Sequence, residues 1–390
     1  MIFDSESVFE ENVITVLKQH GWKDGVLRYP TERDLLDNWK GILYRNNNDI
    51  DRLGKYPLTD GEMTQIIEQI ETLRTPLALN SFVNGRTVSI TRDNKEDVAH
   101  FGKEVSLYIY DRKEIAGGKS TYQIAQQPVY PAKNTMLSSR RGDLVLFING
   151  MPLIHIELKK SGIPVSQATN QIEKYAHEGV FTGLFRLVQI FVAMTPDDAV
   201  YFANPGADKF NPSYYFHWAD YNNEPICGGQ HPGKDEWKLF IGGTSGTAGL
   251  LSIPMAHQLI GFYTIADSAD GCLKVLRSYQ YLAANAISDV VRKCDWEQRP
   301  SMPGRPGGYV WHTTGSGKTM TSFKSAQLIA DSHDADKVVF LMDRIELGTQ
   351  SLKEYRSFAD SETEVQGTEN TGVLRDKLNS TNVNDTLIVT

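Results

Sequence analysis

The chain has 390 residues, of which 40% are hydrophobic and 23% are charged, and its formal net charge is −8. This composition excludes a wholly disordered or fibrous protein, and the length leaves room for about two to three domains. The net negative charge does not indicate a nucleic-acid-binding protein. It does not exclude one either, because local basic patches decide nucleic-acid binding more than the net charge does.

No segment predicts export or insertion into a membrane. No window approaches the roughly 18 apolar residues that a membrane-spanning helix needs. The N-terminal sequence MIFDSESVFEENV is acidic and lacks the basic flank and apolar core of a secretory signal. Cys227, Cys272 and Cys294 form no CxxC pair, so we expect neither a disulfide framework nor a zinc site, and the cytoplasm fits best.

The first 200 residues alternate between helical and strand-like patterns. Apolar residues at helical spacing predict an amphipathic helix over residues 4–20, capped by Ser5 or Ser7 with Glu10 as the capping-box partner. Residues 32–80 have a mostly helical pattern, and a further helix is expected over residues 165–179. Short β-type runs are expected at residues 105–110, 143–148, 153–158, 187–194 and 200–203.

A change of composition divides the chain. Residues 204–254 are rich in Gly, Pro, Asn and aromatic side chains, which indicates a boundary or a loop-heavy extension. We therefore expect one domain over residues 1–250, with this extension from about residue 204, and a second over residues 251–390. In the second domain, helices are expected at 273–293, 318–330 and 346–358, and strands at 308–311, 337–343 and 386–390. This alternation is typical of a parallel α/β sheet.

The strongest chemical signal is a glycine-rich loop, HTTGSGKT, over residues 312–319. Glycines let the backbone turn so that its N–H groups face an anion, and the following helix adds the positive end of its dipole. Lys318 can reach the β- and γ-phosphates of ATP, and the Thr319 hydroxyl can ligate Mg²⁺. His312 departs from the full GxxxxGK[ST] pattern, which has Gly there. The predicted ATP-binding residues are Thr314, Gly315, Ser316, Gly317, Lys318 and Thr319.

An ATPase also needs a Walker B acid, which holds Mg²⁺ and positions water. No apolar strand ending in Asp-Glu follows residue 319, and the chain ends at LIVT in a strand-like pattern. We therefore expect a fragment that is cut inside its nucleotide-binding domain, before Walker B. Such a fragment would bind ATP weakly at best and hydrolyse little of it alone.

The second signal is a predicted hairpin, RRGDLVLFINGMPLIHIELKK, over residues 140–160 with its turn at Asn149-Gly150. Asp143 begins the first strand, and Glu157 and Lys159 share a face of the second. Two carboxylates can hold Mg²⁺, and a nearby ammonium can stabilise charge or lower the pKa of an attacking water. This is the D…ExK arrangement of metal-dependent nucleases.

The turn sets a condition on this site. A regular two-residue turn would pair Asp143 with Ile156 and leave Glu157 on the other face. A three-residue loop with Gly150 in the left-handed conformation, or a β-bulge, would bring Asp143 and Glu157 to one face, and Pro152 fits an irregular start of the second strand. We therefore predict an irregularity in this hairpin.

The same spacing also fits an edge hairpin with a solvent-facing charged pair. Strongly apolar residues between the charges favour the metal site, as do Gln171 and Tyr175, which lie four apart on one face of the next helix. His155 is expected on the same face as Glu157, as a packed residue more than a ligand. A basic cluster suited to phosphate contacts consists of Arg140, Arg141, Lys159 and Lys160.

Together these segments resemble the N-terminal part of the R (motor and endonuclease) subunit of type I restriction–modification enzymes. The resemblance covers nearly the whole chain and runs in order through SESVFEENVI, RRGDLVLFINGMPLIHIELKK, NQIEKYAHE, QIFVAMTPDDAVYFAN, LRSYQYLAAN, GGYVWHTTGSGKTMTSFKSAQLIA and KVVFLMDRIELGTQ. It implies a RecB-like (PD-(D/E)xK) nuclease domain with a mixed β-sheet, followed by a RecA-like parallel α/β helicase domain. ATP, Mg²⁺, duplex DNA and the methyltransferase and specificity subunits are the implied cofactors and partners.

The resemblance also implies roles for individual residues. Asp143, Glu157 and Lys159 match the nuclease triad. Gln171 and Tyr175 match a QxxxY element thought to support that site or to contact DNA. Gly142 replaces the Pro that often precedes the first acid, and the Walker B motif and the second helicase domain are missing.

Three further positions match family elements outside that triad. Glu6 matches an acid on the first helix, and a helix-start charge is an equally good explanation for it. Gln280 matches the glutamine that reads adenine before helicase phosphate loops, and an ordinary surface position is its alternative. Asp343-Arg344 matches helicase motif Ia.

The leading hypothesis is an ATP- and Mg²⁺-dependent endonuclease and translocase subunit that cleaves duplex DNA non-specifically after translocation. One alternative is a helicase-like ATPase whose degenerate nuclease domain serves as a DNA-binding module. Another is a non-enzymatic scaffold in which both motifs are structural.

Overall fold

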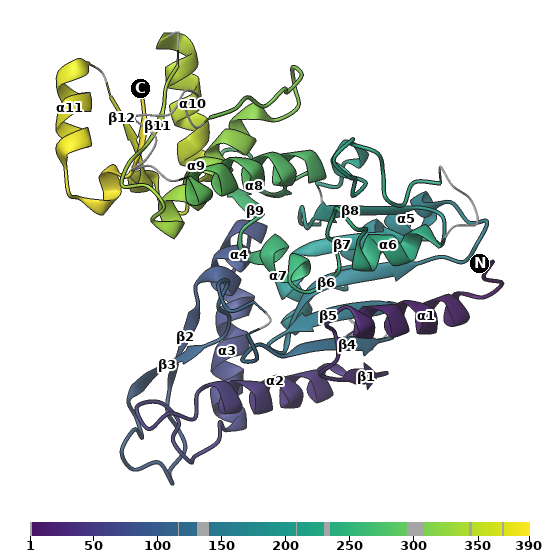
Figure 1. The fold of residues 1–390 in the computed structure, drawn as a ribbon. Coiled ribbons are helices and arrows are strands. Elements are labelled where there is room, and N and C mark those ends of the chain that lie inside the picture. The colour runs from purple at the N-terminus through teal and green to yellow at the C-terminus, as the bar shows by residue number, and fades with distance from the viewer. Residues whose placement is uncertain are drawn as a thin grey trace. The chain divides into compact units, whose positions relative to one another are not determined.

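The computed structural model of the chain describes residues 2–115, 117–130, 140–207, 209–229, 235–294, 307–342, 345–368 and 370–390. The chain divides into two compact units (Figure 1). Unit 1 consists of Met1–Thr264 and Cys272–Val275, and unit 2 of Ile265–Gly271 and Leu276–Thr390. No helix among the described residues is long and apolar enough to cross a membrane.

Unit 1 is built on a mixed six-stranded sheet in the order β1-β4-β5-β6-β7-β8. Its strands are β1 (Val26–Arg28), β4 (Tyr122–Gln126), β5 (Leu144–Ile148), β6 (Met151–Leu158), β7 (Ile190–Met194) and β8 (Ala199–Ala203). The pairs β1/β4 and β6/β7 are parallel, and the other three neighbouring pairs are antiparallel. Every residue of β5 and β6 is buried, because both strands lie in the interior of the sheet.

Helices pack around this sheet, and α5 contacts β6 and β7. The helices of unit 1 are α1 (Glu6–Gln19), α2 (Glu32–Asn46), α3 (Asp60–Thr72), α4 (Pro76–Asn84), α5 (Val165–His177), α6 (Glu236–Gly242) and α7 (Met255–Gly261). The Ser5 hydroxyl caps α1 by accepting the N–H of Val8 at 3.3 Å. The prediction that Glu10 completes a capping box was wrong, because the helix begins at Glu6 and turns Glu10 inward, where it is buried.

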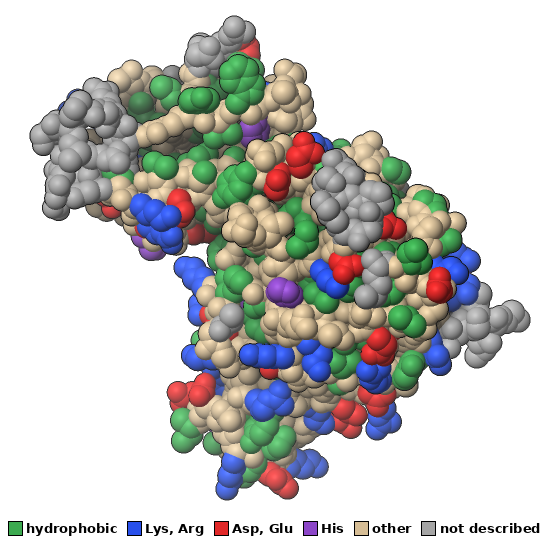
Figure 2. Space-filling model, turned by 45° about the vertical axis from the view of Figure 1, so that its right-hand side comes forward, with side chains coloured by type: hydrophobic (Ala, Val, Ile, Leu, Met, Phe, Trp, Pro, Cys, Tyr) green, Lys and Arg blue, Asp and Glu red, His purple; other side chains and the backbone are tan. Residues whose placement is uncertain are grey.

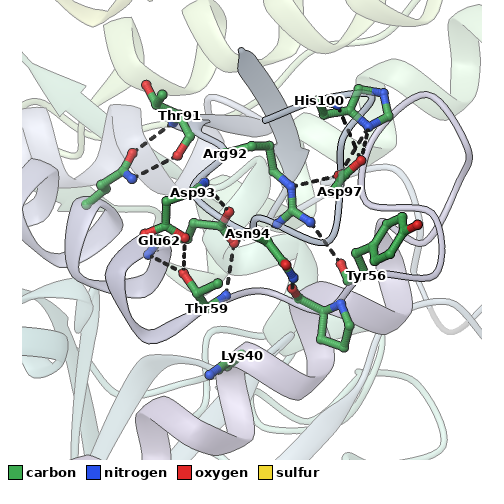
Figure 3. Close-up of polar contacts among 12 residues, drawn as sticks. Lys40, Tyr56, Thr59, Glu62, Thr91, Arg92, Asp93, Asn94, Asp97 and His100 are labelled. Atoms are coloured by element: carbon green, nitrogen blue, oxygen red, sulfur yellow. Dashed lines mark hydrogen bonds and ion pairs between the residues drawn. The ribbon is translucent and has the colours of Figure 1, made fainter. Parts of the chain in front are cut away.

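A two-stranded arm, β2 (Thr87–Thr91) with β3 (Glu104–Tyr108), extends from unit 1. A buried ion-pair network centred on Arg92 joins its loop to α3 (Figure 3). The Arg92 guanidinium lies 2.6 Å from a carboxylate oxygen of Glu62 and 3.1 Å from one of Asp97, and it donates to the Tyr56 carbonyl at 3.1 Å. Both carboxylates and the guanidinium are fully buried, so each charge depends on the others.

The Gly- and Pro-rich stretch after residue 204 packs into unit 1. Trp218 and Trp237 are buried, and the Trp218 indole N–H donates to the Ala248 carbonyl at 2.8 Å. Helix α6, which contains Trp237, contacts α1. This stretch therefore contributes to the core of unit 1, although it contains little regular structure.

Unit 2 has a parallel three-stranded sheet in the order β11-β13-β12, as the alternation of helices and strands predicted. Its elements are α8 (Ser278–Lys293), α9 (Lys318–Ser332), β11 (Val338–Phe340), α10 (Ile345–Phe358), β12 (Val365–Gly367), α11 (Thr371–Asn379) and β13 (Leu387–Val389). Phe323 on α9 and Tyr355 on α10 pack with Val365 and Leu387 of the sheet to form its core.

Two local predictions were wrong. The expected strand at residues 308–311 is irregular, and no described strand pairs with it, so its backbone has no ladder partner. The helix expected from residue 273 begins only at Ser278, because Cys272–Val275 forms strand β10, next to β9 (Thr264–Asp267). The apolar run there fits both periodicities, which is why the pattern alone misassigned it.

Candidate functional site

The β5–β6 hairpin has the irregularity that the sequence predicted. Asn149 and Gly150 both have positive φ, 53° and 82°, and form the tight turn. Next to the turn Ile148 pairs with Met151 and Phe147 with Pro152, but beyond a register shift Leu146 pairs with Ile154. The extra residue is Leu153, and the shifted register pairs Leu144 with Ile156. One step further along, Asp143 therefore lies opposite Glu157, on the same face of the sheet.

Glu157 is completely buried, and neither of its carboxylate oxygens accepts a hydrogen bond from any residue that the structure describes. Asp143 is partly exposed, and one of its oxygens accepts the Leu158 N–H at 2.7 Å. Desolvation, together with the charge of the neighbouring Glu157, raises the pKa of Asp143 to about 8. Burial also raises the pKa of Glu157 to about 7, against the opposing charge of Lys159. Desolvation thus favours the protonated forms of both acids, and Lys159 offsets this effect only in part.

These oxygens fit a divalent cation. Buried carboxylate oxygens without hydrogen bonds are unusual, and a metal ion would satisfy them. Within the described residues, no group of three or more His, Cys, Asp or Glu side chains could hold a metal. Two carboxylates are nevertheless enough for Mg²⁺, which usually keeps several waters and is bound by one or two carboxylates together with substrate phosphates. The donor set suits Mg²⁺ and does not suit zinc.

Lys159 brings an ammonium group beside the acids. Its Nζ lies 3.5 Å from Glu157 Oε1 and 3.7 Å from Glu6 Oε1, and donates to the Leu158 carbonyl at 2.8 Å. Only 10% of the Lys159 side chain is exposed. The predicted residues Asp143, Glu157 and Lys159 are therefore brought together, and Glu6 lies at their edge.

His155 packs behind the acids. Its Nδ1 lies 2.8 Å from the Tyr130 hydroxyl, and its Nε2 lies 3.4 Å from Glu157 Oε2. Burial lowers the pKa of His155 to about 4, so the ring is neutral at pH 7 and does not balance the charge of Glu157. Phe181 and Phe191 pack against the ring, as expected for a packed histidine.

Gln171 and Tyr175 form hydrogen bonds with each other and with the backbone that leads into Asp143. Gln171 Nε2 donates to the Tyr175 hydroxyl at 2.7 Å, and that hydroxyl donates to the Arg141 carbonyl at 2.9 Å. Burial raises the pKa of Tyr175 to about 12, so it remains a donor. The pair ties α5 to the backbone two residues before Asp143.

Glu10 is a residue of this site that the sequence analysis did not assign to it. Its Oε2 accepts from Gln127 Nε2 at 3.2 Å, and its Oε1 is buried with no hydrogen-bond partner among the described residues. Burial raises the pKa of Glu10, and the charge of Asp143 raises it further. The available signal was its place on the apolar stripe of the first helix with Val13 and Leu17, where an acid is unexpected.

The basic cluster is only partly available for phosphate contacts. Arg140 forms two hydrogen bonds with the Glu178 carboxylate, at 2.9 and 3.0 Å. Lys160 donates to the Asp4 carbonyl at 3.2 Å, while Arg141 is exposed. Over the lower part of the face in Figure 2, which belongs to unit 1, Lys and Arg side chains alternate with Asp and Glu. No broad basic surface is seen on that face.

In unit 2 the glycine-rich loop leads directly into α9. Gly315 and Gly317 have φ of 76° and 79°, the left-handed conformation that favours glycine. Lys318 Nζ donates to the Thr313 carbonyl at 2.9 Å, so the lysine folds back over the loop. Thr319 lies in the first turn of α9, at the positive end of the helix dipole. The other two predicted ATP-binding residues, Thr314 and Ser316, lie in the same loop, and Thr314 is exposed.

Gln280 lies behind this loop. Its Nε2 donates to the Gly317 carbonyl at 3.2 Å, and its Oε1 accepts the Arg277 N–H at 3.0 Å. A Cβ on residue 317 would lie 2.5 Å from that amide nitrogen and would displace it, and the φ of 79° disfavours any other residue there. Gln280 therefore supports the loop, and its reading of adenine stays a prediction. Asp343 and Arg344, the predicted motif Ia, lie outside the described residues.

Comparison with known proteins finds one family match in each part of the chain. Residues 4–210 match the family "Type I restriction enzyme R protein N terminus", and residues 279–390 match "SWI2/SNF2 ATPase". A type I restriction enzyme endonuclease subunit of Staphylococcus aureus is 32% identical over 97% of this chain, and one of Staphylococcus saprophyticus is 31% identical over 96%. An Escherichia coli EcoprrI endonuclease subunit is 27% identical over 80% of this chain and 90% of its own length. The chain spans 36% and 35% of the two staphylococcal subunits.

Proposed function

This chain belongs to the family of type I restriction enzyme R proteins, and from that premise we propose that unit 1 is a Mg²⁺-dependent DNA endonuclease and unit 2 part of an ATP-driven DNA motor. The enzyme class is that of type I site-specific deoxyribonucleases, whose endonuclease subunits are its homologues. Duplex DNA is the proposed substrate. The methyltransferase and specificity subunits are the proposed partners, and specificity for a DNA sequence would come from them.

One observation carries the nuclease proposal. The bulge at Leu153 places Asp143 opposite Glu157, and within the described part of the chain both oxygens of Glu157 are buried without hydrogen bonds. A solvent-facing charged pair, the alternative considered for this hairpin, would leave Glu157 exposed, whereas it is fully buried. The mixed sheet that presents the hairpin supports a RecB-like nuclease fold.

The chemistry follows from the side chains. Asp143 and Glu157 would hold Mg²⁺, which when bound supplies a Lewis acid for the scissile phosphate and lowers the pKa of water. The Lys159 ammonium, 3.5 Å from Glu157, would stabilise the negative charge that develops on the phosphate. Tyr175 holds the backbone that leads into Asp143, so the acid is oriented before DNA arrives.

The loop of unit 2 supports ATP binding in the same way. Lys318 would exchange the Thr313 carbonyl for the β- and γ-phosphates, and the Thr319 hydroxyl would ligate the nucleotide's Mg²⁺. Gln280 fixes the backbone of Gly317, which must present its N–H to the phosphates.

The decisive experiment compares cleavage and ATP hydrolysis in a full-length R subunit carrying this chain, assembled with its methyltransferase and specificity subunits. Asp143→Ala should abolish cutting of supercoiled DNA and leave ATP hydrolysis intact, because the acid lies in unit 1 and the phosphate loop in unit 2. The control is Asp37→Ala, which changes an exposed aspartate of α2 and should alter neither activity. Cutting by the Asp143→Ala assembly at the wild-type rate would reject the site and favour the degenerate-nuclease alternative.

A further inference from the structure

Tyr29 is an exposed aromatic residue held in an unfavourable backbone conformation near the acids. It follows β1 directly, 51% of it is exposed, and its φ is 54°. A positive φ is uncommon for a bulky residue, and the following Pro30 restricts the backbone of Tyr29 further. Two hydrogen bonds enforce the conformation, from the Tyr29 N–H to the Gln126 carbonyl at 2.8 Å and from the Val129 N–H to the Pro30 carbonyl at 2.9 Å.

Gln127 has the same unusual conformation on the neighbouring strand. Its φ is 46°, and it too precedes a proline. Its side chain has a visible use, because Nε2 donates to Glu10 at 3.2 Å and its N–H donates to the Asp143 carbonyl at 2.8 Å. Such conformations persist where the surrounding structure imposes them, and they cluster at active sites and ligand clamps. Asn or Gly would fit position 29 with less strain, so the ring itself needs an explanation.

The position of Tyr29 suggests that explanation. Strand β1 pairs with β4 and β4 with β5, so Tyr29 lies two strands from Asp143. Strands lie about 4.8 Å apart, which puts the two backbones roughly 10 Å from each other. The Arg141 guanidinium lies 6.0 Å from the centre of the Tyr29 ring, and Arg141 is exposed two residues before Asp143. An aromatic ring and an exposed guanidinium thus lie together near the acids.

We propose that Tyr29 and Arg141 form a nucleotide platform, on which Tyr29 stacks with an unpaired base of the strand being cut while Arg141 binds the adjacent phosphate. This inference rests on the proposed nuclease function, since it takes DNA as the ligand. Aromatic stacking tolerates any base because every base has a π-face, which suits an enzyme that cuts without reading sequence. Arg is well suited to the phosphate because its fork matches two oxygens.

The test uses the full-length R subunit in an Asp143→Ala background, so that DNA is bound and not cut. The probe is a gapped duplex whose single-stranded stretch contains 5-iododeoxyuridine, which crosslinks to a stacked aromatic ring on illumination. Tyr29→Phe keeps the ring, whereas Tyr29→Asn removes it and still tolerates a positive φ. Tyr221→Asn is the matched control, because Tyr221 is an exposed tyrosine of the same unit, 71% accessible.

We expect the crosslink to map to Tyr29 by mass spectrometry. Tyr29→Asn should abolish it and weaken binding of the gapped duplex by about five- to 150-fold, the range for the loss of one stacked base. Tyr29→Phe and Tyr221→Asn should bind like the parent protein. Arg141→Ala should lower the slope of log affinity against log salt by about one.

Unchanged binding and crosslinking by Tyr29→Asn would overturn the platform. A loss of both supports it when the thermal unfolding of the variant matches that of the parent, and a loss also seen with Tyr29→Phe would overturn it, because the ring is kept. A crosslink that maps elsewhere would overturn it as well. Neither result bears on the acids, because the cleavage assay of Asp143→Ala in the complete assembly tests them independently. Failure of the nuclease proposal and failure of the platform are therefore distinguishable.

Discussion

Asp143 and Glu157 hold protons more tightly in the folded chain than in the unfolded chain, because burial raises both pKa values. For such acids the unfolded state releases its proton first as pH rises, so the free energy of unfolding falls with rising pH. For Asp143 the window extends from its ordinary pKa of 3.8 to about 8. Without bound metal, the site therefore destabilises the fold most at alkaline pH.

This linkage predicts the behaviour of Asp143→Asn in the presence of a chelator. The amide oxygen can still accept the Leu158 N–H but takes no charge. Thermal unfolding should show a higher Tm for the variant than for the wild type at pH 8, with the difference nearly gone at pH 4. An equal difference at both pH values would show that the pKa of Asp143 is not raised.

At three positions the sequence predicted which side chains lie close together, while their roles in catalysis stay a prediction. Asp143, Glu157 and Lys159 were found from the D…ExK spacing, and the structure brings them together. Glu10 was missed because its position after two serines also fits a capping box, a local pattern that competes with its place on the buried stripe. The unusual backbone of Tyr29 could not be predicted, because a Tyr-Pro sequence does not indicate a positive φ.

At the scale of elements, the Arg92 network holds the β2–β3 arm against α3. Arg92→Ala would leave the buried Glu62 carboxylate without its ion-pair partner and Asp97 with His100 alone, which costs about 3 kcal/mol or more. We expect a matching loss in the free energy of unfolding, measured by urea denaturation. The control is Lys40→Ala, which removes an ion pair with the exposed Asp60 and should change stability little. Equal effects of the two variants would contradict the structural role of the network.

The same scale shows which elements the sequence could predict. Helices and strands with strong periodicity, such as α1, α5, β5 and β6, lie where they were expected to within a few residues. The predictions of a strand at residues 308–311 and of a helix from residue 273 were wrong. Strand formation depends on a partner strand, which a local sequence pattern does not contain. The bulge was predictable because a metal site needs Asp143 and Glu157 on one face of the sheet, and a regular two-residue turn would place them on opposite faces.

At the scale of the whole chain, the two candidate sites lie in separate units. Lys318→Ala in the complete assembly should therefore abolish ATP hydrolysis and also cleavage, because the proposed nuclease acts after ATP-driven translocation. Asp143→Ala should lose cleavage alone. Lys353→Ala, which changes an exposed lysine of α10, is the control. Cleavage by Lys318→Ala at the wild-type rate would show that cutting does not depend on the motor.

The order of the two units could be predicted from the sequence, since the acidic hairpin precedes the phosphate loop. The packing inside unit 1 could not be predicted. The stretch after residue 204 has a loop-like composition, yet Trp218 and Trp237 are buried in unit 1. Trp237 lies on α6, which contacts α1 at the far N-terminal end of the unit, and composition does not encode such a long-range contact.

The extra residue at Leu153 has a consequence for the evolution of this hairpin. In a flat hairpin closed by a two-residue turn, an even number of residues separates any two that face each other. Thirteen residues separate Asp143 from Glu157, an odd number, so the bulge corrects the parity. If a homologous hairpin gains or loses one residue between its acids, the number of bulges must also change by one for the acids to stay on one face. Insertion or deletion of two residues leaves the acids on one face without any change in the bulge.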